Sequence, residues 1–324
     1  MFQHEFNKLF KLIVPADVGW ITGDDIYNIN PESLKKYKLV VVDYSCEHYG
    51  NHPAPMPAYH DLVKMGINFI FLTHHEPDHL LEPNYLFFPH HYFKKIDNIN
   101  PMYESINCTS KKFKLSCLNK NPHAHRIYNF LKLREKHYFN QMLFTFYNIS
   151  NIPRPDAPLL DVGMIYKWEE IRNDLKQKIE EEPKIADNDH PAYLDSYIHL
   201  ITETTILDKI FITEKTWKSI ASGQLFILLG TPGSIQHLRN LDVDTFDDYI
   251  DHNYYDNEPD WKKRIDKIHK LIDHFMQLSE DELYKINVET QSRRLENAKK
   301  YFAGEFISKY IVCLREKINE LSIR

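Results

Sequence analysis

Glycine is scarce in this chain, at 9 of 324 residues. Three of the nine lie within residues 211–233, FITEKTWKSIASGQLFILLGTPG, which also contain an acidic and a basic residue side by side. Glycine lets the backbone turn tightly and approach another group where a side chain would collide. The glycines next to charged residues therefore mark this segment as a candidate binding site.

Cysteine and long apolar runs are also scarce. The four cysteines are scattered and form no CxxC pair: Cys46, Cys108, Cys117 and Cys313. This spacing indicates reduced thiols in a reducing compartment. No stretch reaches the roughly 18 apolar residues of a membrane span. The apolar run LFKLIV near the N-terminus is interrupted by lysine, so we expect neither a signal peptide nor an anchor, and a cytoplasmic protein.

Positive charge is not in excess, because 40 Lys and Arg stand against 46 Asp and Glu, a formal net charge of −6. This balance argues against a protein that coats nucleic acid non-specifically. A local basic groove that binds nucleic acid is still compatible with it. The composition, 43% hydrophobic and 27% charged, is typical of a soluble globular protein. The length fits about two domains.

Short apolar runs alternate with helical segments in the order typical of α/β proteins. In the first third we expect strands at 38–45, 67–75 and 85–93 and a helix at 58–66. A second series begins near residue 111, with expected strands at 111–119, 141–148, 196–204 and 224–231 and helices at 126–139, 213–223 and 234–241. Helical periodicity dominates from about residue 258 onward. The pattern predicts two facing Rossmann-like domains with a cleft between them and a helical C-terminal tail.

The segment HEPDH, residues 75–79, matches the HExxH pattern of zinc proteases. That pattern binds zinc only on a helix, where residues four apart share a face. Pro77 lies inside the segment, which directly follows an expected strand, so we expect a loop and no metal site. His75, Glu76 and Asp78 are candidates for contacting an acceptor, and the alternative is a solvated polar loop.

Three polar stretches follow expected strands. In ITEKTWK, residues 212–218, Thr213 is a candidate N-cap with Glu214 and Lys215 in the first helical turn. A lysine is disfavoured at that end of a helix, which hints at an anionic partner such as a diphosphate. Glu214 can accept hydrogen bonds from ribose hydroxyls. The alternative interpretation is a capped surface helix with incidental charges.

The other two stretches supply an arginine and two carboxylates. In LNKNPHAHR, residues 118–126, Arg126 opens a helix and can bind a phosphate. In VVVDYSCEHYGNHP, residues 40–53, Asp43 and Glu47 end a strand of the first domain. Either carboxylate can take the proton from an acceptor hydroxyl that attacks an anomeric carbon. A surface arginine and a solvated loop acid are the structural alternatives.

The order and spacing of these stretches resemble the α1,3-fucosyltransferases, a family of GT-B-fold glycosyltransferases. The best match is YIHLITETTILDKIFITEKTWKSIASGQLFILLGTP, residues 197–232. The Thr-Glu-Lys core of the family is present here as residues 213–215. Glu203 matches the glutamate of the family's Glu-Asn pair, and Thr204 or Thr205 stands in place of the asparagine. The resemblance covers residues 38–255.

The resemblance implies roles for individual residues. FKLSCLNKNPHAHR looks like the strand-loop-arginine element that places Arg126 on the donor β-phosphate, and Asn119 lies in the same element. DYSCEHYGNHP is similar to the turn that carries the general base, which makes Glu47 the matching carboxylate, with Asp43 as its rival. The residues expected at the donor are therefore Asn119, Arg126, Glu203, Thr213, Glu214, Lys215 and Gly230, the last because it lets the backbone come close.

The resemblance implies a GT-B glycosyltransferase that inverts the anomeric centre, with a GDP- or UDP-linked sugar as co-substrate and no obligatory metal or other cofactor. We expect an acceptor domain at 1–108, a donor domain at 109–290, and C-terminal helices at 291–324 that pack back toward the first domain. The expected acceptor is a glycan or lipid-linked saccharide met in the cytosol.

Two alternatives stay open besides a zinc hydrolase. One is a viral, for example phage, glycosyltransferase that modifies hydroxymethylated DNA bases, which the A/T-rich character of the composition suits and the net negative charge disfavours. The other is a non-catalytic module that binds a sugar nucleotide or a glycan. In that module Arg126 and Lys215 would bind the ligand, and Glu47 would have no catalytic role.

Overall fold

The computed structural model describes residues 15–22, 30–43, 62–73, 85–87, 109–146, 170, 191–207 and 210–322, and the statements below concern these residues. The chain divides into two compact units. Unit 1 consists of Met1–Asp97 and Gly304–Arg324, and unit 2 of Asn98–Ala303. The division thus falls at residues 97 and 303, whereas the sequence predicts it at 108 and 290.

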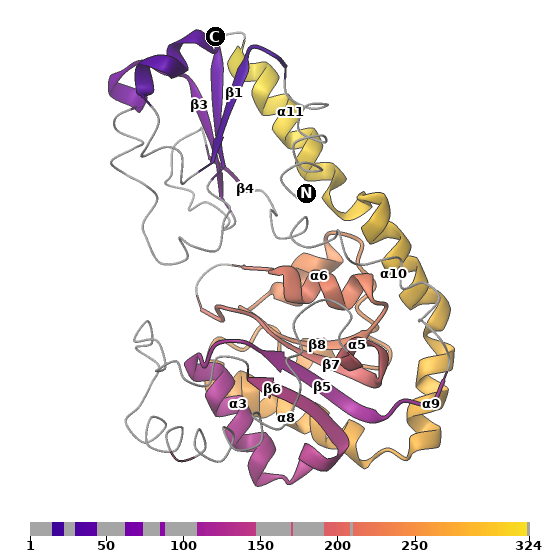
Figure 1. Ribbon diagram of the computed structural model, residues 1–324. Helices are drawn as coiled ribbons and strands as arrows, with labels where there is room; N and C mark the ends of the chain where they lie inside the picture. Colours follow the sequence, from indigo (N-terminus) through magenta and orange to yellow (C-terminus); the bar gives the residue numbers. More distant parts are fainter. Residues whose placement is uncertain are drawn as a thin grey trace. The chain divides into compact units, whose positions relative to one another are not determined.

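Unit 1 contains a four-stranded parallel sheet in the order β1-β2-β3-β4 (Figure 1). Its strands are β1 (Val18–Thr22), β2 (Leu39–Asp43), β3 (Phe69–Thr73) and β4 (Tyr85–Phe87). All five residues of β2 are buried, because both faces of a parallel sheet are covered and β-branched side chains fill them. A 3-10 helix, η2 (Pro31–Lys36), precedes β2.

Both faces of this sheet are packed. On one face Val40, Val42 and Phe71 form a core with Leu62 and Ile67. On the other, helix α11 (Ser308–Ser322) covers the sheet with three apolar side chains from successive turns: Leu314, Ile318 and Leu321. Asn68 Nδ2 also donates to the Leu321 carbonyl at 2.6 Å. The end of the chain therefore completes the core of unit 1.

Unit 2 contains a second four-stranded parallel sheet, in the order β6-β5-β7-β8 (Figure 1). Its strands are β5 (Phe113–Asn119), β6 (Met142–Phe146), β7 (Ser196–Thr202) and β8 (Leu225–Leu229). The central strand β7 and the strand β8 are buried at every position. All four strands coincide with strands predicted from the sequence, within two residues at each end.

Helices cover both faces of the second sheet. Helices α3 (Ala124–Glu135) and α8 (Trp261–Gln277) lie on one face, and α6 (Glu214–Ala221) and α10 (Gln291–Ala303) on the other (Figure 1). The other helices with described bounds in this unit are α5 (Pro191–Leu194), α7 (Ser234–Arg239), α9 (Glu280–Glu289) and the 3-10 turns η7 (Tyr138–Gln141) and η8 (His252–Tyr254). A last 3-10 turn, η9 (Glu305–Ile307), precedes α11.

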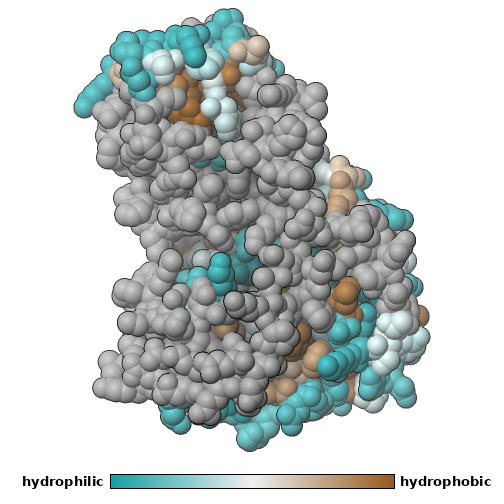
Figure 2. Space-filling view, viewed as in Figure 1, coloured by the Kyte–Doolittle hydropathy of each residue, from teal (hydrophilic) through white to brown (hydrophobic). Residues whose placement is uncertain are grey.

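The outer surface of α3 and α8 is mostly hydrophilic in the lower part of Figure 2. This agrees with the amphipathic pattern of α8, whose Ile265, Ile268 and Ile272 are buried while lysines alternate with them. The C-terminal helices at 291–324, which we expected to pack back toward the first domain, divide between the two units. Helix α11 packs on the first sheet, whereas α10 packs on α6, and its Arg294 is buried and donates to the Gly223 carbonyl at 2.8 Å. Among the described helices, none is long and apolar enough to cross a bilayer.

Shortening a buried side chain of α11 should destabilise unit 1. Ile318 is 1% exposed, so Ile318→Ala leaves a cavity and should lower the free energy of unfolding by about 2–5 kcal/mol, measured by urea denaturation. Val312 lies on the same helix and is 49% exposed, so the control Val312→Ala should change it by less than about 0.5 kcal/mol. Equal effects of the two changes would contradict the packing described here.

Candidate functional site

The carboxyl edge of the second sheet gathers most of the residues that the sequence analysis assigns to a donor. Ligands of open α/β sheets bind beyond this edge. Strands β5 and β7 end there at Asn119 and Thr202, and the Thr202 hydroxyl donates to Asn119 Oδ1 at 2.5 Å. Both side chains are 1% exposed. They fix the two strand ends to each other from inside the protein.

Glu203 directly follows β7 and is completely buried. Its carboxylate accepts hydrogen bonds from the Thr213 amide at 2.9 Å, the Thr213 hydroxyl at 2.5 Å and the Thr216 hydroxyl at 2.6 Å. The donors all belong to the beginning of α6. Glu203 therefore holds that helix against the end of β7, which makes it a positioning residue in this structure.

Burial raises the pKa of the Glu203 carboxyl group, because removal from water disfavours the charged form. The positive charge of Lys215 and the hydrogen bonds from the two threonines act in the opposite direction. Lys215 thus lies close enough to Glu203 to influence its protonation. The protonation of the buried Glu203 therefore depends on the positive charge of Lys215 at the α6 N-terminus.

Helix α6 begins as the sequence predicts. Thr213 is its N-cap, and its hydroxyl accepts from the Lys215 amide at 3.3 Å. The Lys215 ammonium lies near three oxygen atoms: Thr213 Oγ1 at 3.1 Å, Glu214 Oε1 at 3.2 Å and Thr204 Oγ1 at 3.3 Å. The side chains of Lys215 and Glu214 are 19% and 17% exposed, and Oε2 of Glu214 is buried.

Arg126 lies in the first turn of α3 and is 1% exposed. Its Nη2 donates to the Thr202 carbonyl at 2.9 Å and its Nη1 to the Asn121 carbonyl at 3.2 Å. Next to it, His125 Nε2 donates to the Glu203 carbonyl at 2.9 Å. Burial, together with the charge of Arg126, holds the pKa of His125 well below its usual range. Arg126 therefore brings a positive charge to this edge while its guanidinium binds backbone carbonyls.

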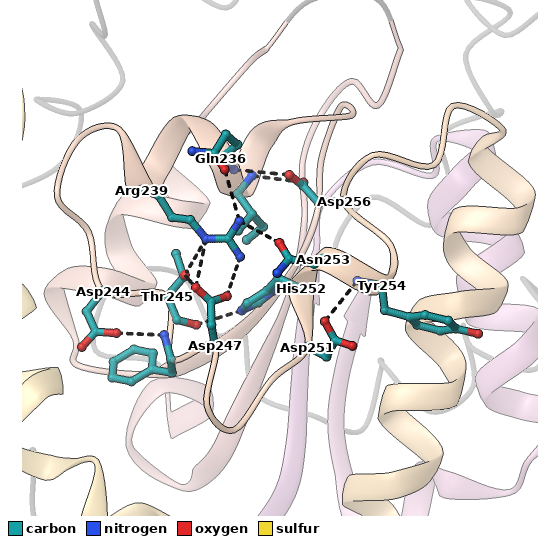
Figure 3. A network of polar contacts seen from close by, with 12 residues as sticks. Gln236, Arg239, Asp244, Thr245, Asp247, Asp251, His252, Asn253, Tyr254 and Asp256 are labelled. Carbon is teal, nitrogen blue, oxygen red and sulfur yellow. Dashed lines mark hydrogen bonds and ion pairs between the residues drawn. The ribbon is translucent and has the colours of Figure 1, made fainter.

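The glycine-rich turn after β8 has a structural explanation of its own. A Cβ on Gly230 would lie 2.6 Å from Ser234 Oγ, and Gly233 has a φ of +81°. The first turn of α7 is occupied by a carboxylate of the chain, because Asp256 accepts from the amides of Ile235 at 3.1 Å and Gln236 at 3.3 Å (Figure 3). A donor contact at Gly230 stays a prediction.

A polar network anchors the segment that carries Asp256 (Figure 3). Arg239 of α7 binds both carboxylate oxygens of Asp247, at 2.9 and 2.5 Å, and Asn253 Oδ1 at 3.0 Å. His252 is buried, with Nε2 2.9 Å from the Thr245 carbonyl and Nδ1 2.6 Å from the Tyr255 hydroxyl. A carbonyl only accepts, so Nε2 carries the hydrogen and Nδ1 accepts from the tyrosine. Burial lowers the pKa of His252 to about 4.

The predicted site residues fall into three groups. Unit 2 brings together at one sheet edge Asn119, Arg126, Glu203, Thr213, Glu214, Lys215 and Gly230. Asp43 ends β2 in unit 1 and is 3% exposed. Glu47, His75, Glu76 and Asp78 lie outside the described residues.

Neither metal nor disulfide chemistry is visible in the described part of the chain. No group of three or more His, Cys, Asp or Glu side chains there is placed to hold a metal ion. Both described cysteines, Cys117 and Cys313, are free thiols. Burial raises the pKa of Cys117 to about 12, so that thiol stays protonated.

Two residues near this edge, Asp256 and Arg264, were not predicted from the sequence. Arg264 belongs to α8 and is 1% exposed. A signal was present, because Arg264 directly precedes Ile265 in the apolar periodicity of RIDKIHKLIDHFMQL and an arginine is unusual next to a buried stripe. Asp256 gave no comparable signal within its acidic loop.

The comparisons with known proteins give no match: neither the protein-family models, nor the curated proteins, nor the solved structures contain a detectable relative of this chain.

The neutral, buried His252 predicts how stability depends on pH. The unfolded chain binds a proton near pH 6.5 and the folded chain only near pH 4, so stability is present above pH 6.5 and falls as the pH drops toward 4. The full effect corresponds to roughly 3 kcal/mol. In His252→Gln this contribution is absent. As the pH falls from 6.5 to 4, the free energy of unfolding of the wild type should therefore decrease relative to that of the variant by about 1.4 kcal/mol per pH unit.

The measurement is urea denaturation at several pH values between 4 and 7. Other titrating groups, including Glu203, contribute equally to both proteins and cancel in the difference. The exposed His274 provides the matched control His274→Gln, which should keep the wild-type profile. A His252→Gln profile parallel to that of wild type would contradict the neutral, buried state of His252.

Proposed function

We propose that this chain is an inverting glycosyltransferase of the GT-B type that transfers a sugar from a nucleoside-diphosphate sugar to a hydroxyl acceptor. The observation that supports the proposal is the first turn of α6. It holds Lys215 and Glu214 partly exposed at the carboxyl edge of a parallel sheet, fixed by Glu203. Helix N-termini and ammonium groups both bind phosphate.

Lys215 is the proposed ligand of the donor diphosphate. Its ammonium is held only by hydroxyls and by Glu214, at 3.1–3.3 Å, and a diphosphate would compete well for such contacts. The buried charge of Arg126 adds a positive potential at the same edge, although its terminal nitrogens bind Thr202 and Asn121. Glu214 is the proposed acceptor of ribose hydroxyl hydrogen bonds.

The proposed chemistry is a single displacement. A carboxylate of unit 1, in a GT-B arrangement of the two units, takes the proton of the acceptor hydroxyl as its oxygen attacks the anomeric carbon. The bond from that carbon to the diphosphate breaks on the opposite face, and Lys215 stabilises the departing charge. Glu47 is the proposed base and Asp43 the alternative. The burial of Asp43 disfavours it, because a base must reach the acceptor.

The proposed acceptor is a glycan or lipid-linked saccharide met in the cytosol. A non-catalytic sugar-nucleotide-binding module would use the same α6 turn, so donor binding alone does not separate it from an enzyme. Turnover and its dependence on Glu47 separate the two.

The donor site predicts a specific ligand response. A nucleoside diphosphate, GDP or UDP, at about 100 times its Kd should add roughly 2.7 kcal/mol to the stability of the wild type, a rise of several degrees in Tm. Lys215→Ala should lose most of this ligand-induced shift. Lys218→Ala, one turn further along α6, is the control and should retain it. A thermal-shift panel that finds no response to GDP, UDP or their sugar conjugates would refute the nucleotide-sugar proposal.

The base assignment predicts a separation of turnover from binding. Glu47→Gln should lower kcat by two or more orders of magnitude, since the amide cannot take the proton, while the Kd for the donor diphosphate stays within about twofold. Donor hydrolysis and transfer to mixed acceptor saccharides provide the assay. An unchanged kcat in Glu47→Gln together with its loss in Asp43→Asn would move the role to Asp43.

A further inference from the structure

The guanidinium of Arg264 is buried with most of its hydrogen-bonding capacity unused. Nη2 donates to the Ile206 carbonyl at 2.8 Å. Nε and Nη1, which carry three of the five N–H donors of an arginine, contact no acceptor within the described part of the chain. The residue is 1% exposed, so bulk solvent does not reach the guanidinium.

Such an arrangement is energetically unfavourable. Buried polar groups are almost always hydrogen-bonded, and a buried charge normally has an ion-pair partner. Among the described residues, no carboxylate forms an ion pair with Arg264. The nearby acids Asp256, Glu258 and Asp260 act on it only through longer-range attraction. Burial outweighs that attraction and lowers the pKa of Arg264 to about 10.

Arg264 lies beside the N-terminus of α3. Trp261, one turn earlier on α8, packs its ring 5.4 Å from the ring of Tyr128 on α3. Arg264 Nη2 and His125 Nε2 bind the same short segment, at the carbonyls of Ile206 and Glu203 respectively. The positive charge of Arg264 is also felt at His125, in the first turn of α3. The guanidinium and that helix end therefore belong to one neighbourhood.

The N-terminus of α3 differs from those of α6, α8 and α9 in its capping. The other three have side-chain caps: Thr213 on α6, Asp260 on α8 and Ser279 on α9. The N-cap residue of α3, His123, makes no side-chain cap hydrogen bond. The amides of a helix N-terminus attract anions, and an uncapped one keeps that capacity.

We propose that Arg264 and the first turn of α3 together bind a phosphoryl group of the ligand. The inference rests on the proposed function, because the group it assigns is one phosphate of the donor diphosphate, next to the part bound by Lys215. Binding would give the three unused N–H donors of Arg264 an acceptor and neutralise its charge. Local movement must accompany binding, because Nε and Nη1 are covered in this structure.

The test uses the whole chain with inorganic pyrophosphate, inorganic phosphate, GDP and UDP as probes in isothermal titration calorimetry. Arg264→Lys keeps the charge and loses the planar donor array, and Arg264→Met removes both. The matched control is Arg239→Lys, because Arg239 has bound partners on three sides in the same unit. We expect pyrophosphate and the preferred nucleoside diphosphate to bind at least tenfold more weakly to both Arg264 variants and within twofold of wild type to Arg239→Lys.

A second measurement needs no folded variant. The Nε–H resonance of Arg264 in the wild type, identified by selective assignment, should shift on addition of pyrophosphate. An unchanged resonance at saturation would overturn the inference.

The outcomes separate this inference from the proposed function. Nucleoside-diphosphate binding that is the same in wild type and in the Arg264 variants overturns the role of Arg264 and leaves the glycosyltransferase proposal standing. Pyrophosphate binding that needs Arg264, without binding of GDP, UDP or their sugar conjugates, supports the phosphoryl site and removes the nucleotide-sugar donor. Binding of none of the probes by the wild type overturns both.

Discussion

The carboxylate of Glu203, which is completely buried, joins the end of β7 to the beginning of α6 through three hydrogen bonds of 2.5–2.9 Å. Replacing Glu203 by an apolar residue would leave several buried donors unpaired. This lowers the free energy of unfolding far more than the loss of a surface contact does. Because the donors are the Thr213 amide and two threonine hydroxyls, these hydrogen bonds fix both the start and the rotation of α6. The direction in which Lys215 and Glu214 point follows from them.

The same sheet edge concentrates positive charge. Arg126, Lys215 and Arg264 come from three different helices, and His125 stays neutral among them. Arg126 donates to two backbone carbonyls, and Arg264 donates to one. Lys215 donates to hydroxyls and to one carboxylate. The three cations are thus compensated to different degrees, and the least compensated ones are the natural partners for an anion. A diphosphate carries the charge and the acceptor oxygens that such an edge lacks.

Sequence periodicity predicted the α/β class and seven of the eight strands in the described part of the chain, because buried parallel strands are continuous apolar runs. It missed β1, where Gly19 interrupts the apolar pattern: a Cβ there would lie 2.6 Å from the ring of Tyr37, a tertiary contact that local sequence does not reveal. The cap at Thr213 was predictable from local chemistry. The burial of Glu203, the carbonyl contacts of Arg126 and the isolation of Arg264 were not, because each depends on segments far apart in the chain.

Hydrogen–deuterium exchange of the whole chain, with and without saturating GDP and UDP and their sugar conjugates, tests the central claim most directly. A donor site at the carboxyl edge of the second sheet predicts slower exchange of the amides at the start of α6, near Lys215, and at the start of α3, near Arg126. The buried strands β7 and β8 should show little change by comparison. Protection confined to other segments, or no protection with any of these ligands, would contradict a nucleotide-sugar site at this edge.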